Sequence, residues 1–189
     1  MNKAECKIDA NGDKHWYLNG NRHRVDTDPM GLTLPAIEYA DGDKRWYLNG
    51  KYHRVDIDPK TGLTLPAIEC ANGDKCWFLN GKYHRVDIDP KTGLTLPAIE
   101  CVNGDKCWFL NGNRHRVDID PMGLTLPAIE CANGDKYWYL NGNRHRVDGP
   151  ASEYANGKTL YYINGKHIPQ LNNKRIYGKE KLNKYLLLV

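Results

Sequence analysis

A tryptophan recurs along the chain at nearly constant intervals of 30 or 31 residues, at Trp16, Trp46, Trp77, Trp108 and Trp138. Around each tryptophan stands the same string, Gly-Asp-Lys-x-Trp-(Tyr/Phe)-Leu-Asn-Gly-x-x-His-Arg-Val-Asp. A motif repeated at fixed spacing is the signature of a tandem-repeat architecture. We therefore expect five near-copies of one unit, followed by a degenerate sixth copy at 161–167.

Each copy has the pattern of three short strands. The first, x-Trp-(Tyr/Phe)-Leu, ends at Asn-Gly, the preferred pair for a type I′ hairpin turn because both turn positions need positive φ. The second strand is His-Arg-Val-Asp, and an Asp-Pro turn leads to the third, Leu-Thr-Leu-Pro-Ala-Ile-Glu, whose proline favours an edge or a bulge. These local, antiparallel connections predict an all-β fold, an elongated β-hairpin meander or solenoid.

The fifth copy is shorter than the others. Elsewhere eight or nine residues connect Val-Asp to Pro-Ala, but after Asp148 a single Gly149 does so. We infer a minimal unit of about 23 residues that carries an optional, projecting hairpin extension.

Alternation of side chains along a strand assigns the two faces of each unit. Trp16, Leu18, His23 and Val25 are expected on a packed side, and Tyr17 and its arginine neighbours on an exposed side. The predicted core ladder consists of Trp16, Trp46, Trp77, Trp108, Trp138, His23, His53, His84, His115 and His145. The candidate binding face consists of Tyr17, Arg24, Tyr47, Arg54, Phe78, Arg85, Phe109, Arg116, Tyr139 and Arg146.

The pattern changes after residue 168. Leu182, Tyr185, Leu186 and Val189 have helical spacing between lysines, which predicts a short helix over 178–188. We divide the chain into repeats at 1–168 and a basic C-terminal cap at 169–189, because a repeat array needs its end covered against association.

The stretch 138–157, Trp-Tyr-Leu-Asn-Gly-Asn-Arg-His-Arg-Val-Asp-Gly-Pro-Ala-Ser-Glu-Tyr-Ala-Asn-Gly, resembles MORN-like hairpin repeats, in a divergent form found in large phages, giant viruses and some bacteria. Asn-Gly-x-x-His-Arg is similar to the Asp-Gly-x-x-His-Gly centre of a MORN unit. Arginine in place of the glycine, the Val-Asp-Gly-Pro-Ala segment and the extensions depart from that pattern. The resemblance implies an open β-ribbon used for protein or membrane-surface contact, without catalytic residues.

Two residue sets invite a chemical interpretation. The five His-Arg-Val-Asp quartets contain acid–base groups, but they recur in every unit, whereas catalysis needs one unusual environment, so we expect scaffold use and no enzyme. Cys70 and Cys76, like Cys101 and Cys107, bracket an Asn-Gly turn and could be thiols, a disulfide or ligands. The spacing is not that of a zinc knuckle, and we predict no metal and no cofactor.

Function is predicted as a non-catalytic repeat scaffold that mediates protein–protein interaction. The resemblance extends this prediction to a phage- or virus-encoded protein that binds or inhibits a host protein. The alternatives are nucleic-acid or nucleotide binding through the Arg/aromatic ladder, and a structural spacer or virion component. The formal charge of +4 resides in the tail, which makes a nucleic-acid groove in the repeats less favoured. The N-terminal sequence lacks the apolar run of a signal peptide, and no stretch is long enough for a membrane span, so a cytoplasmic location is expected.

Overall fold

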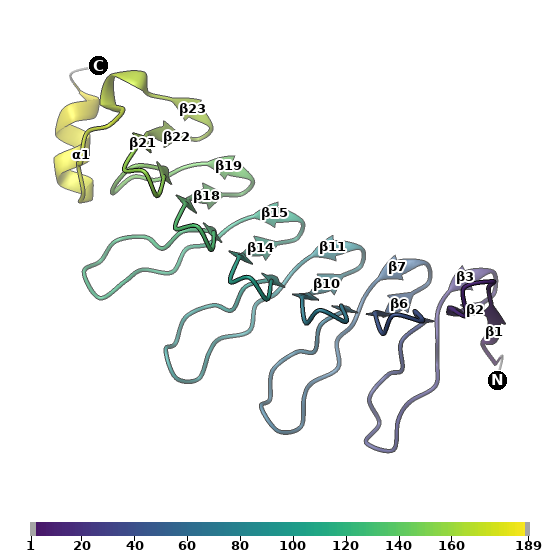
Figure 1. Cartoon of the computed structure of the whole chain (residues 1–189). Helices are drawn as coiled ribbons and strands as arrows, with labels where there is room; N and C mark the ends of the chain where they lie inside the picture. Colours follow the sequence, from purple (N-terminus) through teal and green to yellow (C-terminus); the bar gives the residue numbers. More distant parts are fainter. Residues whose placement is uncertain (1–2, 188–189) are drawn as a thin grey trace. The chain divides into compact units, whose positions relative to one another are not determined.

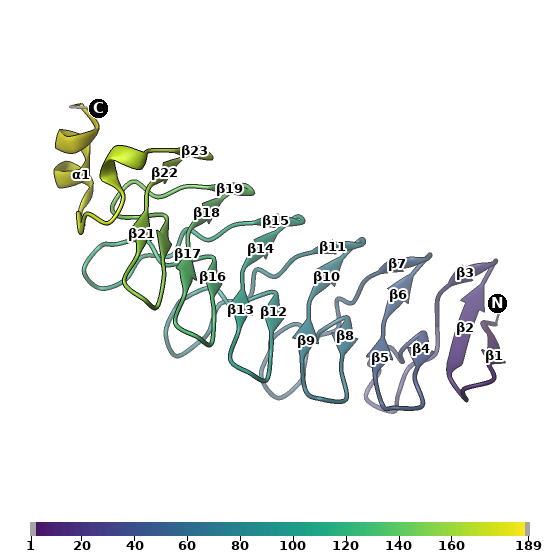
Figure 2. The same cartoon turned by 45° about the horizontal axis from the view of Figure 1, so that its top comes forward.

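A computed structural model describes residues 3–187 and confirms the all-β prediction. The chain forms two compact units, unit 1 with residues 1–87 and 98–102 and unit 2 with residues 88–97 and 103–189. Each unit is an antiparallel meander of short hairpins, and unit 2 also contains the C-terminal helix (Figures 1 and 2).

Unit 1 contains one sheet in the order β1-β2-β4-β5-β8-β9-β12, in which β3 also pairs with β2. Two further pairs, β6–β7 and β10–β11, are separate two-stranded hairpins. The strands are β1 (Glu5–Ile8), β2 (Lys14–Leu18), β3 (Asn21–Arg22), β4 (Ile37–Glu38), β5 (Lys44–Arg45), β6 (Tyr47–Leu48), β7 (Lys51–Tyr52), β8 (Ile68–Glu69), β9 (Lys75–Cys76), β10 (Phe78–Leu79), β11 (Lys82–Tyr83) and β12 (Ile99–Glu100).

Unit 2 repeats this arrangement, with a sheet in the order β13-β16-β17-β20-β21 and the separate hairpins β14–β15, β18–β19 and β22–β23. The strands are β13 (Lys106–Cys107), β14 (Phe109–Leu110), β15 (Asn113–Arg114), β16 (Ile129–Glu130), β17 (Lys136–Tyr137), β18 (Tyr139–Leu140), β19 (Asn143–Arg144), β20 (Ser152–Glu153), β21 (Thr159–Leu160), β22 (Tyr162–Ile163) and β23 (Lys166–His167).

The predicted type I′ turns are present. In the hairpin β6–β7, Asn49 has φ of 49° and Gly50 has φ of 78°, and the corresponding asparagines of the other copies of the repeat have φ between 49° and 51°. An asparagine tolerates this left-handed region and glycine adopts it without steric cost, which fixes the two-residue turn.

The predicted hairpin extensions are also present. In the second copy of the repeat Ile57 bridges Thr64, and the tip from Asp58 to Gly62 is closed by the hydrogen bond from the Gly62 N–H to the Asp58 carbonyl. Figure 1 shows these extensions as long loops on the side away from the Asn-Gly hairpins within each unit. The proline of the predicted third strand, Pro66, is buried between the bridge at Thr64 and the short strand β8.

The C-terminal cap covers the last hairpins of unit 2. A 3-10 helix, η1 (Pro169–Leu171), precedes the helix α1 (Lys179–Leu186), which confirms a helix within the predicted 178–188; residues 188 and 189 lie outside the described part. Leu182 is fully buried against Tyr161, Leu171 and Ile176, so the cap closes this end of the array with a small apolar core. None of the helices within residues 3–187 has the length and apolar character needed to cross a membrane.

Candidate binding surface

The arginine of each His-Arg-Val-Asp quartet lies at the centre of a polar network that holds one copy of the repeat together. In the second copy of the repeat, the Arg54 guanidinium lies 3.8 Å from the centre of the Trp46 ring. Its Nε donates to Asp56 at 2.8 Å, and its Nη1 donates to the Pro66 carbonyl at 3.1 Å and to Glu69 at 3.0 Å. Planar, multidentate recognition of this kind suits a guanidinium and could not be reproduced by a lysine.

The same network recurs in both units. Every quartet arginine lies 3.7 to 3.9 Å from the centre of its tryptophan ring. Each also pairs with one aspartate and one glutamate: Arg24 with Asp26 and Glu38, Arg54 with Asp56 and Glu69, Arg85 with Asp87 and Glu100, Arg116 with Asp118 and Glu130, and Arg146 with Asp148 and Glu153.

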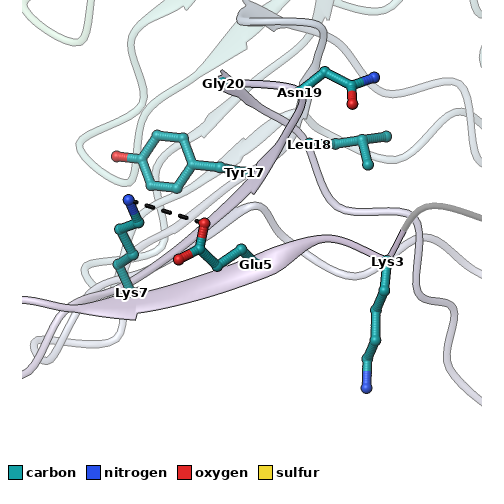
Figure 3. A pocket seen from close by; sticks show the side chains of 7 residues that line it. All are labelled: Lys3, Glu5, Lys7, Tyr17, Leu18, Asn19 and Gly20. Carbon is teal, nitrogen blue, oxygen red and sulfur yellow. Dashed lines mark ion pairs between the residues drawn. The ribbon is translucent and has the colours of Figure 1, made fainter.

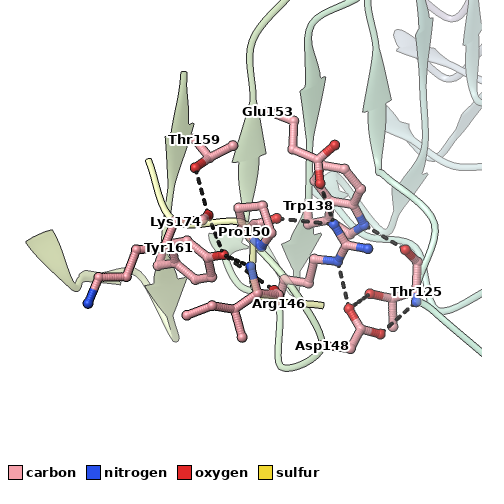
Figure 4. A network of polar contacts seen from close by, with 10 residues as sticks. Thr125, Trp138, Arg146, Asp148, Pro150, Glu153, Thr159, Tyr161 and Lys174 are labelled. Atoms are coloured by element: carbon pink, nitrogen blue, oxygen red, sulfur yellow. Dashed lines mark hydrogen bonds and ion pairs between the residues drawn. The ribbon is translucent and has the colours of Figure 1, made fainter. Parts of the chain in front are cut away.

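A threonine of each extension ties this network to the next copy. The Thr125 N–H and hydroxyl donate to Asp148, and the Thr125 carbonyl accepts the Trp138 Nε1–H at 2.7 Å (Figure 4). In unit 1, Thr33 contacts Asp56 and Trp46 in the same way, and Thr64 contacts Asp87 and Trp77. The returning strand of the extension is therefore bound to the following copy of the repeat.

The predicted exposure of the arginines is wrong. The side chains of Arg24, Arg54, Arg85, Arg116 and Arg146 are only 13%, 5%, 5%, 4% and 4% exposed. The reason is that the strand ends before the arginine is reached. In the second copy β7 consists of Lys51 and Tyr52 alone, and the His-Arg-Val-Asp segment that follows is not a strand. The alternation of faces ends there, so the arginine turns onto the indole and the neighbouring valine faces solvent.

The buried tryptophan ladder, in contrast, is confirmed, with each indole between 5% and 8% exposed. The predicted core histidines are half-buried, and four of them, His23, His53, His115 and His145, contact the next copy of the repeat. The His53 Nδ1 accepts the Asn80 N–H at 3.2 Å, and the same bond joins His115 to Asn141. An acceptor role at Nδ1 requires the imidazole to be unprotonated on that atom.

The valine that follows each quartet arginine is exposed. We call the three such valines of unit 1, Val25, Val55 and Val86, the valine stripe. These side chains are 46%, 58% and 58% exposed, and the equivalent Val117 of unit 2 is 61% exposed. Beside the stripe in unit 1 lies a groove of about 150 Å³ that includes Leu34, Leu48 and Val55 above Trp46. Unit 2 has a groove of about 200 Å³ at equivalent positions, lined by Val117, Leu140 and Val147.

The aromatic members of the predicted binding face stack on each other across the Asn-Gly hairpins. In unit 1 four rings form a stack, and the distances between ring centres are 4.4 Å for Tyr47–Tyr52, 5.0 Å for Tyr52–Phe78 and 4.1 Å for Phe78–Tyr83. In unit 2, arginines alternate with the rings, and Arg114 lies 5.7 Å from Phe109 and 5.5 Å from Tyr139. Tyr17 is half-buried, as are Tyr47, Phe109 and Tyr139, whereas Phe78 is 8% exposed.

The turn between Cys70 and Cys76 has a register that the sequence did not predict. Ile68 pairs with Cys76 and Glu69 with Lys75, so the turn consists of Ala71, Asn72 and Gly73. Cys70 and Cys76 therefore lie on one face but are offset by two residues along the hairpin, and both are free thiols. Burial, and secondarily the neighbouring thiols of Cys70 and Cys101, raises the pKa of Cys76 to about 12.

Aspartates of the Gly-Asp-Lys motif join successive sheet hairpins. Asp105 accepts the Ala132 N–H at 2.7 Å and Asp135 accepts the Ala155 N–H at 2.8 Å, and these bonds hold the pKa of both carboxyls below the ordinary value. At the extension tips, the Lys60 N–H and the Thr61 hydroxyl lower the pKa of Asp58 in the same way.

One group of potential metal ligands lies at the first hairpin, where atoms of Asp9, Asp13 and His15 approach within 4.8 Å of one another. Asp9 already accepts two backbone N–H groups of its own turn, and Asp13 accepts the Ala40 N–H. These carboxylates thus have a structural use in the turn, and the prediction of no metal stays a prediction.

The fold and this surface define an all-β, antiparallel hairpin-repeat protein. Comparison with protein-family models and with curated proteins finds no match for the chain. The resemblance to MORN-like repeats therefore depends on the motifs quoted above.

Proposed function

We propose that this chain is a non-catalytic repeat scaffold that binds another protein through the valine stripe and its adjoining grooves. The observation that carries the proposal is the regular exposure of Val25, Val55 and Val86, each next to a buried arginine. Single exposed apolar residues are ordinary on protein surfaces, but contiguous apolar patches mark interaction sites. Leu48, which lines the groove, adds apolar surface beside Val55 and is 37% exposed.

The spacing of the stripe favours an extended partner segment. Each copy of the repeat contributes two strands to the sheet, and adjacent strands are about 4.8 Å apart, so equivalent valines advance by roughly 9.6 Å per copy. An extended segment in the polyproline II conformation advances about 3.1 Å per residue with three residues per turn, so every third side chain lies on the same side and would meet a new valine. The partner is therefore expected to present apolar residues at a period of three.

Two features speak against the nucleic-acid alternative. Each quartet arginine is already paired with two carboxylates, and the aromatic rings already stack on one another. A nucleic-acid site needs uncompensated positive charge and open aromatic faces. The resemblance to repeats of large phages and giant viruses makes a host protein, met in the host cytoplasm, the first partner to test.

The test is a selection of peptides from a random display library on the immobilised protein, followed by calorimetry with the selected peptides. We expect Val55→Asp to weaken binding at least tenfold and to leave folding unchanged, since a half-exposed site tolerates a polar residue within about 0.5 kcal/mol. Val102→Asp is the matched control, because Val102 is 67% exposed but lies in the turn of a sheet hairpin outside the stripe.

Selection of no peptide would contradict the proposal and favour a structural spacer. Equal loss of binding in both variants would also contradict it, because the binding site would then not be the valine stripe. A parallel titration with an oligothymidylate at several salt concentrations tests the other alternative. Steeply salt-dependent binding of that probe would identify a nucleic-acid protein instead.

A further inference from the structure

The outer edge of β1 is an unpaired sheet edge in unit 1. β1 pairs with β2 on one side, and no strand within residues 3–187 lies on its other side. All four of its residues are exposed, with Ile8 at 66%. An unpaired edge presents a row of backbone donors and acceptors to any further strand.

The hydrogen bonds of Trp16 show which backbone groups face that edge. The Trp16 N–H donates to the Ala36 carbonyl at 2.9 Å, and the Trp16 carbonyl accepts the His23 N–H at 3.0 Å. Both groups of Trp16 therefore point away from β1. Cys6 lies opposite Trp16 and so forms a non-hydrogen-bonded pair with it, which directs the Cys6 N–H and carbonyl to the open edge.

Glu5 and Lys7 flank Cys6 with opposite charges on one face of the strand. Their side chains are 71% and 63% exposed and lie 3.9 Å apart, beside Tyr17 and an open pocket of about 640 Å³ (Figure 3). A strand with the order acid, neutral, base is complementary to itself when it is reversed about its central residue.

We propose that β1 pairs antiparallel with β1 of a second copy of this chain, about a two-fold axis at Cys6. In this register the two Cys6 residues form a hydrogen-bonded pair that uses their outward backbone groups. Glu5 then lies opposite Lys7 of the second copy in a non-hydrogen-bonded pair, where cross-strand side chains are closest. Opposite charges at such positions stabilise a sheet, and the symmetric pairing forms both ion pairs at once.

Other two-fold registers fit the strand less well. Centring on Lys7 brings two lysines together and requires backbone groups that are already directed at β2. Centring on Ile8 uses outward groups but leaves only the end of the strand overlapped, because the chain turns at Asp9 and Ala10. The Cys6 register alone among these combines outward backbone groups at its centre with opposite charges that face each other on both sides of it.

The proposal is tested by sedimentation equilibrium of the full chain under reducing conditions, followed by oxidation with copper–phenanthroline and peptide mapping. Opposed residues of a hydrogen-bonded pair have Cα atoms about 5.5 Å apart, within the range for a disulfide. Each cross-link transfers two electrons from the two thiols to copper(II) and releases two protons. We expect a concentration-dependent dimer and a Cys6–Cys6 cross-link that is absent in Cys6→Ser.

Charge reversal tests the register without altering the fold, because both side chains are exposed. Glu5→Lys and Lys7→Glu should each lower the yield of the cross-link about tenfold, since each converts two attractive pairs into repulsive ones. The double variant Glu5→Lys/Lys7→Glu should restore it. Lys82→Glu, a reversal at an exposed site in another hairpin, should have no effect.

A chain that sediments as a monomer at every concentration overturns the proposal. So does a dimer whose Cys6 cross-link is absent, or whose yield ignores the charge swaps, since either would indicate another interface or random collision. The valine stripe uses different residues, so peptide binding through it is unaffected by any of these outcomes.

Discussion

Replacing Arg54 with alanine should destabilise the second repeat because it leaves the partners of a buried cation uncompensated. The arginine side chain is 5% exposed, stacks on Trp46 and donates to Asp56, Glu69 and the Pro66 carbonyl. Removing one member of a buried ion pair costs about 3–5 kcal/mol, because the remaining charge stays desolvated.

The structure places Arg54→Ala at the lower end of that range. Asp56 is 10% exposed but keeps the N–H and hydroxyl donors of Thr33, and Glu69 is 35% exposed and rehydrates. We therefore expect a loss of about 3 kcal/mol, which includes the lost stacking on the indole. Arg54→Lys should fall between this variant and the parent protein, because it keeps the charge and loses the planar donor fork.

The assay is urea unfolding combined with hydrogen exchange followed by mass spectrometry. Repeat arrays often lack a single cooperative transition, so the local opening of residues 44–69 is the decisive quantity. Arg22→Ala is the matched control, because Arg22 is exposed and its guanidinium lies 5.8 Å from the Tyr47 ring. The reasoning is refuted if Arg54→Ala opens this segment no more than Arg22→Ala does.

Three further predictions concern single contacts of the scaffold. Thr64→Val removes the hydroxyl bond to Asp87 and should cost about 1–2 kcal/mol in urea unfolding. Gly149→Ala places a Cβ 2.9 Å from the Arg146 guanidinium carbon, and the resulting displacement should cost about 1–3 kcal/mol; an unchanged midpoint would contradict it. The pKa of Cys76 is raised from its ordinary 9.0 to about 12, so the folded state binds this proton more tightly, and the stability that it contributes falls as pH rises from 9 to 12. At pH 8 iodoacetamide should therefore modify the exposed Cys6 well before Cys76, as mass spectrometry would show; equal rates would disprove the burial of Cys76.

The parts of the fold that sequence predicts are those fixed by local conformation. Asn49 and Gly50 need positive φ wherever they stand in a two-residue turn, so the hairpin β6–β7 follows from two residues. The tryptophans are buried because each is the largest apolar side chain in its copy of the repeat. The extension also follows from local signals, since Asp58 and Pro59 set one side of its tip and Gly62 the other.

The face of each arginine could not be predicted from alternation, because its position depends on partners far along the chain. Glu69 is 15 residues from Arg54, and the indole that receives the guanidinium is that of Trp46, between β5 and β6. A strand pattern assumes that pairing within the hairpin continues past His53, whereas its last hydrogen bond runs from the His53 N–H to the Trp46 carbonyl and the Arg54 N–H donates to Phe78 of another hairpin. The paired glutamate follows the quartet arginine by 14 or 15 residues in the first four copies and by 7 in the fifth. It always stands in the string Pro-Ala-x-Glu, and this recurring string is the sequence signal that could have revealed the arginine network.

The extensions, which look dispensable because the fifth copy lacks one, complete the hydrogen bonding of the tryptophans. Trp46, Trp77, Trp108 and Trp138 each donate their Nε1–H to a threonine carbonyl of the preceding extension. A buried indole N–H without an acceptor would be costly, so an extension and the tryptophan after it form one structural element. After the fifth copy the tryptophan position is occupied by Tyr161, whose hydroxyl instead donates to the Lys174 carbonyl and accepts the Ile176 N–H of the cap. The fifth copy therefore needs no extension, and the single Gly149 can connect Asp148 to Pro150. The cap supplies the hydrogen-bond partners of Tyr161 that an extension supplies for a tryptophan.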